Sequence, residues 1–289
     1  MREIPIVALI YDFDHTLSPR DMQEYGFLPD LGVEPDDFWA SCRRTAVKNE
    51  MDGVLSYMYR MQEVARGRFD LTRETLGKLG QDIEFFPGVE DWFERINSIG
   101  EENGVSVEHY IISSGLREII KGTKISTYFN MVFASSFMFG DDGIAQWPAT
   151  AVNYTSKTQY LFRINKGILD VTNDRDLNDF TPEQMRRIPF PNMIYVGDGL
   201  TDVPCMKMTK QKGGYSIAVH DESDTRLVDD MLLQKRADFA LPADYRVGSE
   251  METTVSGLFR RIRARYDCVV LHEEQVARAR QRTLLRHGI

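Results

Sequence analysis

Short, uninterrupted apolar runs recur along this 289-residue chain, and they constrain its fold more than any other feature of the sequence. A run without alternating polar residues is typical of a strand that is buried on both faces of a parallel sheet. Six such runs occur, at residues 6–11, 109–112, 131–134, 193–196, 216–219 and 238–241. Helical patterns at 116–127, 157–169 and 222–235 follow or separate them. This alternation predicts an α/β fold with a doubly wound, Rossmann-like parallel sheet.

Residues 18–84 interrupt the alternation, because they contain helical patterns but no convincing strand. The predicted helices cover residues 36–49, 54–65 and 72–79. Apolar residues three or four positions apart form one face of the second helix, and we interpret them as packing inside a helical bundle. They are Val54, Tyr57, Met58, Met61 and Val64. We therefore expect a small α-helical domain, residues 18–84, inserted after the first strand into a core domain of residues 1–17 and 85–289.

Two other segments have weaker patterns. Asp141-Asp142-Gly143, between apolar stretches, indicates a hairpin turn within a short β excursion at 135–156. Residues 250–282 predict one or two helices. The segment 257–289 contains eight arginines and only three acidic residues. We interpret it as a solvated helix face, with a surface for a partner or for phosphate as the alternative.

Composition narrows the class of protein. The chain has 44 acidic and 35 basic residues, a formal net charge of −9, which argues against a general nucleic-acid binder. Three cysteines without close spacing argue against a disulfide framework and favour a reducing compartment, the cytoplasm. No stretch approaches the ~20 apolar residues of a membrane span. We expect no nucleic-acid or membrane partner, and the sequence leaves the oligomeric state open.

Acidic residues follow the first predicted strand, where ligands bind in open α/β sheets. Asp12 and Asp14 come directly after the apolar run 6–11. Two carboxylates at the end of a buried strand are costly unless a cation or proton compensates them. The alternative for this pair alone is a helix cap or turn.

Small polar residues, a lysine and a second acidic pair follow the other strands. Ser113, Ser114 and Gly115 offer hydroxyl and backbone N–H donors to an anion, or form a simple helix N-cap. Lys157 begins a predicted helix, where it opposes the helix dipole and invites an acidic partner, although a surface position is the alternative. Lys166, its rival, lies near the end of that helix. The fourth group is Gly197-Asp198-Gly199-Leu200-Thr201-Asp202, where an ordinary Asp-Gly turn is the alternative.

In this order, each at a predicted strand end, these residues resemble the four motifs of the haloacid dehalogenase (HAD) superfamily of phosphotransferases. Asp12, Asp14 and Thr16 match its Asp-x-Asp-x-Thr motif. Ser113 matches the second motif and is preferred to Ser114 because it directly follows the apolar run. Lys157 matches the third. Gly197, Asp198 and Asp202 match the fourth, Gly-Asp-x-x-x-Asp.

The resemblance implies a Mg²⁺-dependent phosphatase that hydrolyses the phosphomonoester of a small metabolite. It implies that Asp12 attacks phosphorus to form an aspartyl-phosphate. Asp14 is then the general acid and base, and the metal is held by Asp12, the backbone carbonyl of Asp14, and Asp198. Oxygen ligands alone suit Mg²⁺, and no nearby His or Cys cluster suggests zinc. His15 lies inside the motif without a catalytic assignment.

The same resemblance assigns the remaining residues. Ser113 and Lys157 hold the phosphoryl oxygens, and Ser114 and Gly115 contribute to substrate binding. Asp202 orients Lys157 or the water around the metal. Asp14 favours a phosphatase over a dehalogenase, because a halide leaves without a proton. A phosphonatase, which needs a cap lysine such as Lys48, is disfavoured.

The position of the helical insert resembles the cap of the phosphoserine-phosphatase-like branch. With no large insert between Gly115 and Lys157, the leaving group is expected to meet residues 18–84. Candidate contacts are Arg20, Asp21, Arg43, Arg44 and Lys48. Phosphoserine phosphatases carry a Glu soon after the first motif, where this chain offers Asp21 or Glu24, so serine recognition is in doubt. Two other functions stay open: phosphotransfer to an acceptor other than water, and a non-catalytic regulatory or binding protein with this fold.

Overall fold

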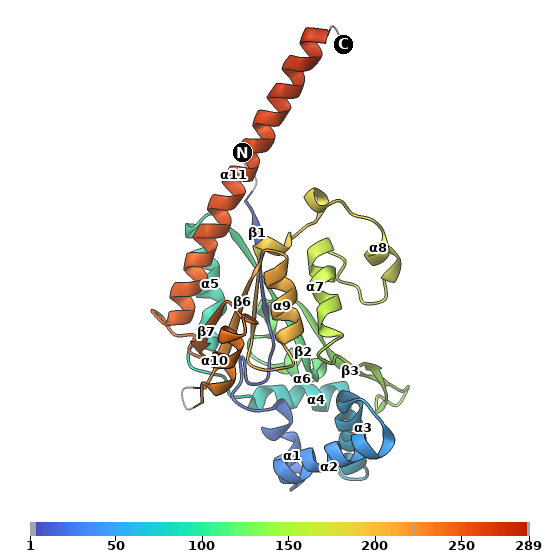
Figure 1. The fold of residues 1–289 in the computed structure, drawn as a ribbon. Coiled ribbons are helices and arrows are strands. Elements are labelled where there is room, and N and C mark those ends of the chain that lie inside the picture. The colour runs from blue at the N-terminus through green and yellow to red at the C-terminus, as the bar shows by residue number, and fades with distance from the viewer. Residues whose placement is uncertain (1–3, 222–223, 288–289) are drawn as a thin grey trace.

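A seven-stranded sheet forms the centre of the molecule in the computed structural model, which describes residues 4–221 and 224–287 (Figure 1). The strands are β1 (Ile6–Tyr11), β2 (Ser106–Leu116), β3 (Phe129–Phe139), β4 (Ala145–Thr150), β5 (Met193–Gly197), β6 (Tyr215–His220) and β7 (Phe239–Pro242). Their order is β4-β3-β2-β1-β5-β6-β7. All neighbours run parallel except β3 and β4. The predicted doubly wound α/β fold is confirmed.

Helices cover both faces of the sheet. The α-helices of the described residues are α1 (Phe27–Asp30), α2 (Pro35–Asn49), α3 (Gly53–Ala65), α4 (Arg73–Leu79), α5 (Val89–Glu102), α6 (Arg117–Gly122), α7 (Lys157–Lys166), α8 (Asp174–Asn178), α9 (Val203–Gln211), α10 (Arg226–Leu233) and α11 (Glu250–His287). Alternate residues of β1 point to opposite faces, as the pleat requires. Leu9 packs in the cluster that contains side chains of α5, α6 and α11, whereas Ile10 packs in the cluster that contains side chains of α7, α9 and α10.

The predicted strands all form, but three predicted helices are shorter than expected. The helix expected at 157–169 is α7, which ends at Lys166 because Gly167 after it adopts a positive φ of 75°. The helix expected at 116–127 is the six-residue α6 and a short 3-10 turn, because β2 continues through Leu116. The helix expected at 222–235 is α10, residues 226–233, and residues 222–223 lie outside the described part of the chain. The hairpin at Asp141-Asp142-Gly143 joins β3 to the antiparallel β4.

The segment between β1 and α5 contains α1–α4, and Figure 1 shows α1, α2 and α3 beyond the carboxyl ends of the strands. The hairpin of β3 and β4 reaches this segment. Ala145 N donates to Leu71 O at 2.8 Å, and Gln62 Nε2 donates to Ala145 O at 2.8 Å. The helices therefore rest on this hairpin as well as on the sheet.

A close crossing attaches α4 to α6. A Cβ atom at Gly80 would lie 2.2 Å from Ile119 O, and one at Gly122 would lie 1.8 Å from Gly77 O. Only glycine permits backbones to approach this closely. The end of the helical segment is therefore packed against the core backbone, whereas α1–α3 lie farther from it (Figure 1).

The 250–282 pattern forms one continuous helix, α11, rather than two. Its first turns are amphipathic and bury Met251, Val255, Phe259 and Ile262 in the core shared with α5. Beyond Ile262 none of the described side chains of α11 is buried, and the helix extends away from the sheet (Figure 1). Among the described residues no helix, α11 included, is long and apolar enough to cross a membrane.

Candidate active site

Two aspartates lie side by side because they end neighbouring parallel strands. Tyr11 of β1 pairs with Val196 of β5, and Asp12 N donates to Val196 O at 2.9 Å. Asp12 and Asp198, which follow these strands, therefore meet at the same edge of the sheet. Each offers a carboxylate oxygen that lies with one of Asp202 in a group no more than 4.8 Å across.

The Lys157 ammonium lies between two of these carboxylates. Its Nζ is 2.8 Å from Asp12 Oδ2 and 2.8 Å from Asp202 Oδ1, and the side chain is completely buried. Burial by itself would lower the pKa of Lys157, but the attraction of Asp12 and Asp202 outweighs it and raises the pKa above its ordinary value. Lys157 therefore carries a fixed positive charge. Lys166 instead donates to the carbonyls of Leu177 and Asp179.

Asp202 has further donors besides the lysine. Tyr195 OH donates to Asp202 Oδ1 at 2.7 Å, and Gly199 N donates to Oδ2 at 3.3 Å. Thr16, the third residue of the first motif, donates from Oγ1 to Asp198 Oδ1 at 3.4 Å. Tyr245 OH, from the segment before α11, holds Thr16 O at 2.8 Å. These contacts fix the orientation of side chains that would otherwise repel one another.

Burial and mutual repulsion raise the pKa values of the carboxyl groups at the strand ends. Burial raises the pKa of Asp12 to about 6, with attraction from Lys157 lowering it and repulsion from Asp202 raising it. Burial and the charges of Asp202 and Asp12 raise the pKa of Asp198 to about 7. A divalent cation would relieve this repulsion, and an all-oxygen donor set suits Mg²⁺ rather than zinc. The residues present fit a magnesium ion.

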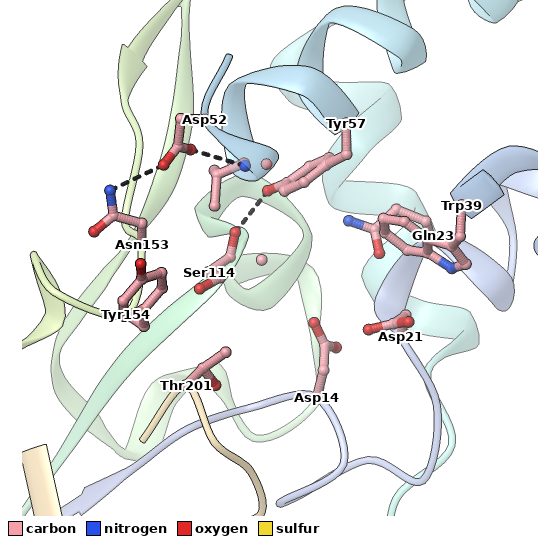
Figure 2. A pocket seen from close by; sticks show the side chains of 13 residues that line it. Asp14, Asp21, Gln23, Trp39, Asp52, Tyr57, Ser114, Asn153, Tyr154 and Thr201 are labelled. Carbon is pink, nitrogen blue, oxygen red and sulfur yellow. Dashed lines mark hydrogen bonds between the residues drawn. The ribbon is translucent and has the colours of Figure 1, made fainter. Parts of the chain in front are cut away.

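Asp14 lines a neighbouring cavity, and its carboxyl group points toward the other lining residues (Figure 2). Its Oδ1 accepts a hydrogen bond from Met22 N at 2.9 Å. Burial, then the charges of Asp21 and Asp12, raise the pKa of Asp14 well above its ordinary value. A carboxyl group in this setting readily carries a proton, as a general acid must. Between Asp14 and Thr16 the chain turns at His15, whose φ of 56° is unusual for a non-glycine residue.

The second-motif residues lie inside a strand, which corrects the expectation that they follow it. Ser113, Ser114 and Gly115 are part of β2, at a register shift between Ser113 and Leu116. Ser113 Oγ is buried and accepts from Gly115 N at 3.0 Å. Ser114 and Gly115 line the cavity, whereas Ser113 is not among the lining residues. A Cβ at Gly115 would lie 2.0 Å from the end of the Met22 side chain, so a larger residue at this position would require Met22 to move.

The cavity has a volume of about 290 Å³ and lies between the strand ends and the helical segment. Asp14 and Thr201 contribute from the sheet side, and Gln23, Trp39 and Tyr57 from the helical side (Figure 2). Of the contacts expected from the helical segment, Asp21 lines the cavity. The described residues that line it do not include the other four, Arg20, Arg43, Arg44 and Lys48.

The loop after β4 also reaches the cavity, which the expectation of residues 18–84 alone had missed. Asn153 and Tyr154 line it. Asn153 Nδ2 donates to Asp52 Oδ2 at 3.0 Å, and Asp52 Oδ1 accepts from Val54 N at 2.8 Å as the N-cap of α3. The short β excursion therefore joins the site to the first turn of α3.

Sequence reasoning also missed Gln23, Trp39 and Tyr57. Tyr57 belongs to an apolar helical stripe and is buried, but its OH donates to Ser114 O at 2.6 Å across the cavity wall. The sequence feature that could have identified Tyr57 is its position near the start of this stripe, at the end of the helix that faces the strand ends. Gln23 and Trp39 follow no pattern in the sequence that distinguishes them from packing residues.

The chain is similar to a protein of Borreliella burgdorferi. That relative is an uncharacterized protein, 32% identical over 231 residues, a match that covers 70% of this chain and 78% of the relative. No family model matches the chain.

Three solved structures share the architecture. A HAD family hydrolase from *Salmonella enterica* serovar Typhi has a TM-score of 0.53 at 17% identity, covering 82% of this chain and 68% of that one. A substrate-bound phosphoserine phosphatase has a TM-score of 0.51 at 16% identity, covering 82% and 93%. A probable phosphoserine phosphatase from *Vibrio cholerae* has a TM-score of 0.53 at 12% identity, covering 91% and 68%. The chain therefore belongs to one family with the *Borreliella* protein, and its fold is that of the HAD hydrolases and phosphoserine phosphatases.

Proposed function

We propose that the protein is a Mg²⁺-dependent phosphatase that hydrolyses a small phosphomonoester through an aspartyl-phosphate on Asp12. The observation that carries this proposal is the position of the fully buried Lys157, 2.8 Å from both Asp12 and Asp202. A buried ammonium beside a carboxylate nucleophile provides the fixed positive charge that a phosphoryl group needs. The fold shared with phosphoserine phosphatases agrees with this chemistry.

The nucleophile is held ready for attack. Asp12 Oδ1 accepts from Phe13 N at 2.8 Å while Oδ2 contacts Lys157, so the carboxylate has one orientation. Attack of a carboxylate oxygen on phosphorus forms the aspartyl-phosphate and breaks the bond to the leaving oxygen. Lys157 and Ser113 hold the phosphoryl oxygens as charge develops on them, and Ser114 and Gly115 contribute to substrate binding. Asp202 keeps Lys157 in place.

Asp14 carries the proton in both half-reactions. Its raised pKa lets it donate a proton to the leaving alkoxide on the cavity side. The resulting carboxylate then takes a proton from the water that attacks the aspartyl-phosphate. General acid–base assistance of this kind contributes typically ~10²–10⁴ in rate.

Asp12, Asp198 and the backbone carbonyl of Asp14 would hold the magnesium ion. When bound, it supplies charge neutralisation between the carboxylates and the phosphate dianion and polarises a phosphoryl oxygen. The close approach of Asp12, Asp198 and Asp202 supports a cation at this place.

The division into a core of residues 1–17 and 85–289 and a cap of residues 18–84 is part of this proposal. In it, the cap covers the leaving group and excludes water.

We also propose that the protein acts in the reducing cytoplasm. Its three cysteines, Cys42, Cys205 and Cys268, are free thiols, which agrees with this assignment.

The test is hydrolysis of para-nitrophenyl phosphate by the full chain with Mg²⁺ and with EDTA. We expect turnover only with Mg²⁺, with inorganic phosphate released in equal amount to the alcohol. Release of the alcohol without inorganic phosphate would point instead to a phosphotransferase. A folded protein without any metal-dependent turnover would contradict enzymatic function and favour a binding protein.

The matched control is Asp12→Asn, which keeps the shape of the side chain and removes the nucleophile. We expect at least a ~10⁴-fold loss of kcat, because the amide oxygen cannot form the covalent bond. The circular dichroism spectrum should be unchanged. Near-normal kcat in this variant would exclude the covalent mechanism.

A further inference from the structure

Tyr195 reaches the candidate site from the interior of β5, although its place in the sequence, within the apolar run 193–196, gives no sign of a role there. Alternate residues of a strand point to opposite faces of the sheet. The residues next to Tyr195 belong to the core cluster that contains side chains of α5, whereas Tyr195 belongs to the cluster that contains side chains of α7 and α9. Its ring therefore lies on the face where α7 begins at Lys157 and α9 begins after Asp202.

The hydroxyl of Tyr195 and the ammonium group of Lys157 donate to the same carboxylate oxygen. Tyr195 OH lies 2.7 Å from Asp202 Oδ1, and Lys157 Nζ lies 2.8 Å from the same atom. Burial, then the charge of Asp202, raises the pKa of Tyr195 well above its ordinary value, so the hydroxyl keeps its proton. All three residues are completely buried. In such surroundings a hydrogen bond to a charged group is stronger than in water.

The remainder of the Asp202 carboxylate is also fixed by the protein. Gly199 N donates to Oδ2 at 3.3 Å, and Asp202 N donates to Gly199 O at 3.0 Å. A Cβ atom at Gly197 would lie 2.5 Å from Asp202 Cγ, so the carboxylate packs against the bare α-carbon of this glycine. Asp202 is therefore a rigid acceptor, and the described side chains that donate to it are those of Tyr195 and Lys157.

Lys157 divides its charge between two acidic groups. Its Nζ is equally distant, 2.8 Å, from Asp12 Oδ2 and from Asp202 Oδ1. An ammonium group has three N–H donors, and these contacts engage two of them. A second donor on Asp202 Oδ1 reduces the negative charge that this oxygen presents to the ammonium group. The Tyr195 hydroxyl thereby weakens the attraction of Asp202 for Lys157 and leaves more of the lysine's charge for Asp12 and for a phosphoryl group.

We propose that Tyr195 is a positioning residue for phosphoryl transfer, which acts through Asp202 to keep Lys157 within reach of the phosphoryl group. This inference rests on the proposed function of the same site. Tyr195 is not among the described residues that line the cavity, so its contribution should be the same for esters with different leaving groups. Loss of its hydroxyl should draw Lys157 toward Asp202 and weaken the binding of phosphate.

The test is the dissociation constant of inorganic phosphate, titrated by calorimetry into the full chain with Mg²⁺. Tyr195→Phe keeps the buried ring and removes only the hydroxyl. We expect phosphate to bind this variant ~5–10-fold more weakly than wild type, because a hydrogen bond to a charged group is lost. An unchanged dissociation constant in the folded variant would overturn the inference, since a tyrosine that only packs in the core alters stability and not phosphate affinity.

The matched control is Tyr160→Phe, which removes another phenol hydroxyl on the same face of the sheet. Tyr160 is buried on α7, and its ring stacks on Phe133 with the centroids 4.6 Å apart. This variant should bind phosphate as tightly as wild type. Equal weakening in the two variants would show that the loss of any buried hydroxyl on this face has the same effect, and it would overturn the assignment of Tyr195.

A double-mutant cycle tests whether Tyr195 acts through Asp202. Asp202→Asn keeps the shape of the side chain and removes its negative charge. In this variant the further change Tyr195→Phe should alter phosphate affinity by less than ~2-fold, because residues that act as a unit are not additive. The same loss of affinity with and without Asp202→Asn would show that Tyr195 acts independently of Asp202, and it would contradict the proposal.

Turnover of para-nitrophenyl phosphate and of phenyl phosphate separates the inference from the proposed function. In Tyr195→Phe we expect kcat/KM for both esters to fall by the same factor, ~10-fold. A fall confined to one ester would place Tyr195 at the leaving group and overturn the inference, whereas the phosphatase would stand. Weaker phosphate binding in Tyr195→Phe supports the inference even if wild type turns over neither ester, an outcome that would count against the proposed function alone.

Discussion

Two buried polar clusters begin at adjacent residues of the chain, Tyr11 and Asp12, and they differ in charge. The first links Trp92 and Asn97, both on α5, with Tyr11 of β1 and His109 of β2. Trp92 Nε1 donates to Tyr11 OH at 2.8 Å, Tyr11 OH pairs with His109 Nδ1 at 3.3 Å, and His109 Nε2 pairs with Asn97 Oδ1 at 2.9 Å. The second is the Lys157 cluster at the strand ends, with Asp12 and Asp202.

The neutral cluster has a single consistent direction of donation. If His109 carries its proton on Nε2, each group from Trp92 to Asn97 donates once to the next. Burial lowers the pKa of His109 to about 3, which keeps it neutral at physiological pH. The charged cluster instead contains two carboxylates for one lysine, and the proposed magnesium ion would balance the negative charge that is left. The first arrangement stabilises the fold, and the second retains unbalanced charge that a substrate and metal can use.

The largest effect is expected from Lys157→Met, which leaves Asp12 and Asp202 buried without their cation. Removal of one partner from a buried ion pair costs ~3–5 kcal/mol. We expect a loss of that size in the free energy of unfolding, measured in urea without added divalent cation, and a loss of phosphatase activity. The double variant Lys157→Met/Asp202→Asn should recover part of the stability but no activity. Unchanged stability in the single variant would show that Lys157 does not offset the buried negative charge of Asp12 and Asp202.

The next effect concerns pH and His109. Its pKa is about 3 in the folded protein and 6.5 in the unfolded chain, so below pH 6.5 the unfolded chain binds a proton that the folded protein does not. The stability that neutral His109 contributes is therefore present above pH 6.5 and is lost as the pH falls toward 3. The expected slope is about 1.4 kcal/mol per pH unit, or roughly 2–3 kcal/mol at about pH 4.5.

The measurement is the difference between the unfolding free energies of wild type and His109→Gln over this pH range. Carboxylates common to both proteins cancel in the difference. A difference that does not change with pH would show that His109 is protonated in the folded protein.

The smallest effect is expected from Tyr11→Phe. The substitution keeps the ring and leaves Trp92 Nε1 and His109 Nδ1 without their partner, at a cost of about 1–2 kcal/mol. Because Tyr11 belongs to the neutral cluster, kcat should stay within ~2-fold of wild type, although Asp12 is the next residue. A thermal melt and a phosphatase assay on the same sample check both parts. A large loss of kcat without a loss of stability would show that the neutral cluster also contributes to catalysis.

The sequence was sufficient to predict the sheet because each of its central strands is buried on both faces and leaves an unbroken apolar run. It predicted less well where polar residues continue a strand. Ser113 and Ser114 end the apolar pattern of β2, yet they remain in the strand because their groups bond within the protein, Ser114 O accepting from Tyr57 and Ser135. Local pattern cannot reveal such long-range partners.

The same limit applies to the candidate site. The aspartates and Lys157 could be placed because their positions follow from strand ends and from the resemblance to the HAD motifs. Gln23 and Asn153 could not, because they become neighbours of the site only through the packing of the helical segment and the β3–β4 hairpin. An unpartnered amide is visible only when its surroundings are known.

The long helix α11 has a consequence for the behaviour of the molecule in solution. A globule of 289 residues would have a radius of gyration of about 19 Å. Figure 1 shows the carboxyl-terminal part of α11 projecting away from the body, and its last thirteen described residues, 275–287, alone extend ~20 Å at 1.5 Å per residue. The particle should therefore tumble and sediment as an elongated body, and its X-ray scattering should show a maximum dimension well above that of a sphere of equal mass.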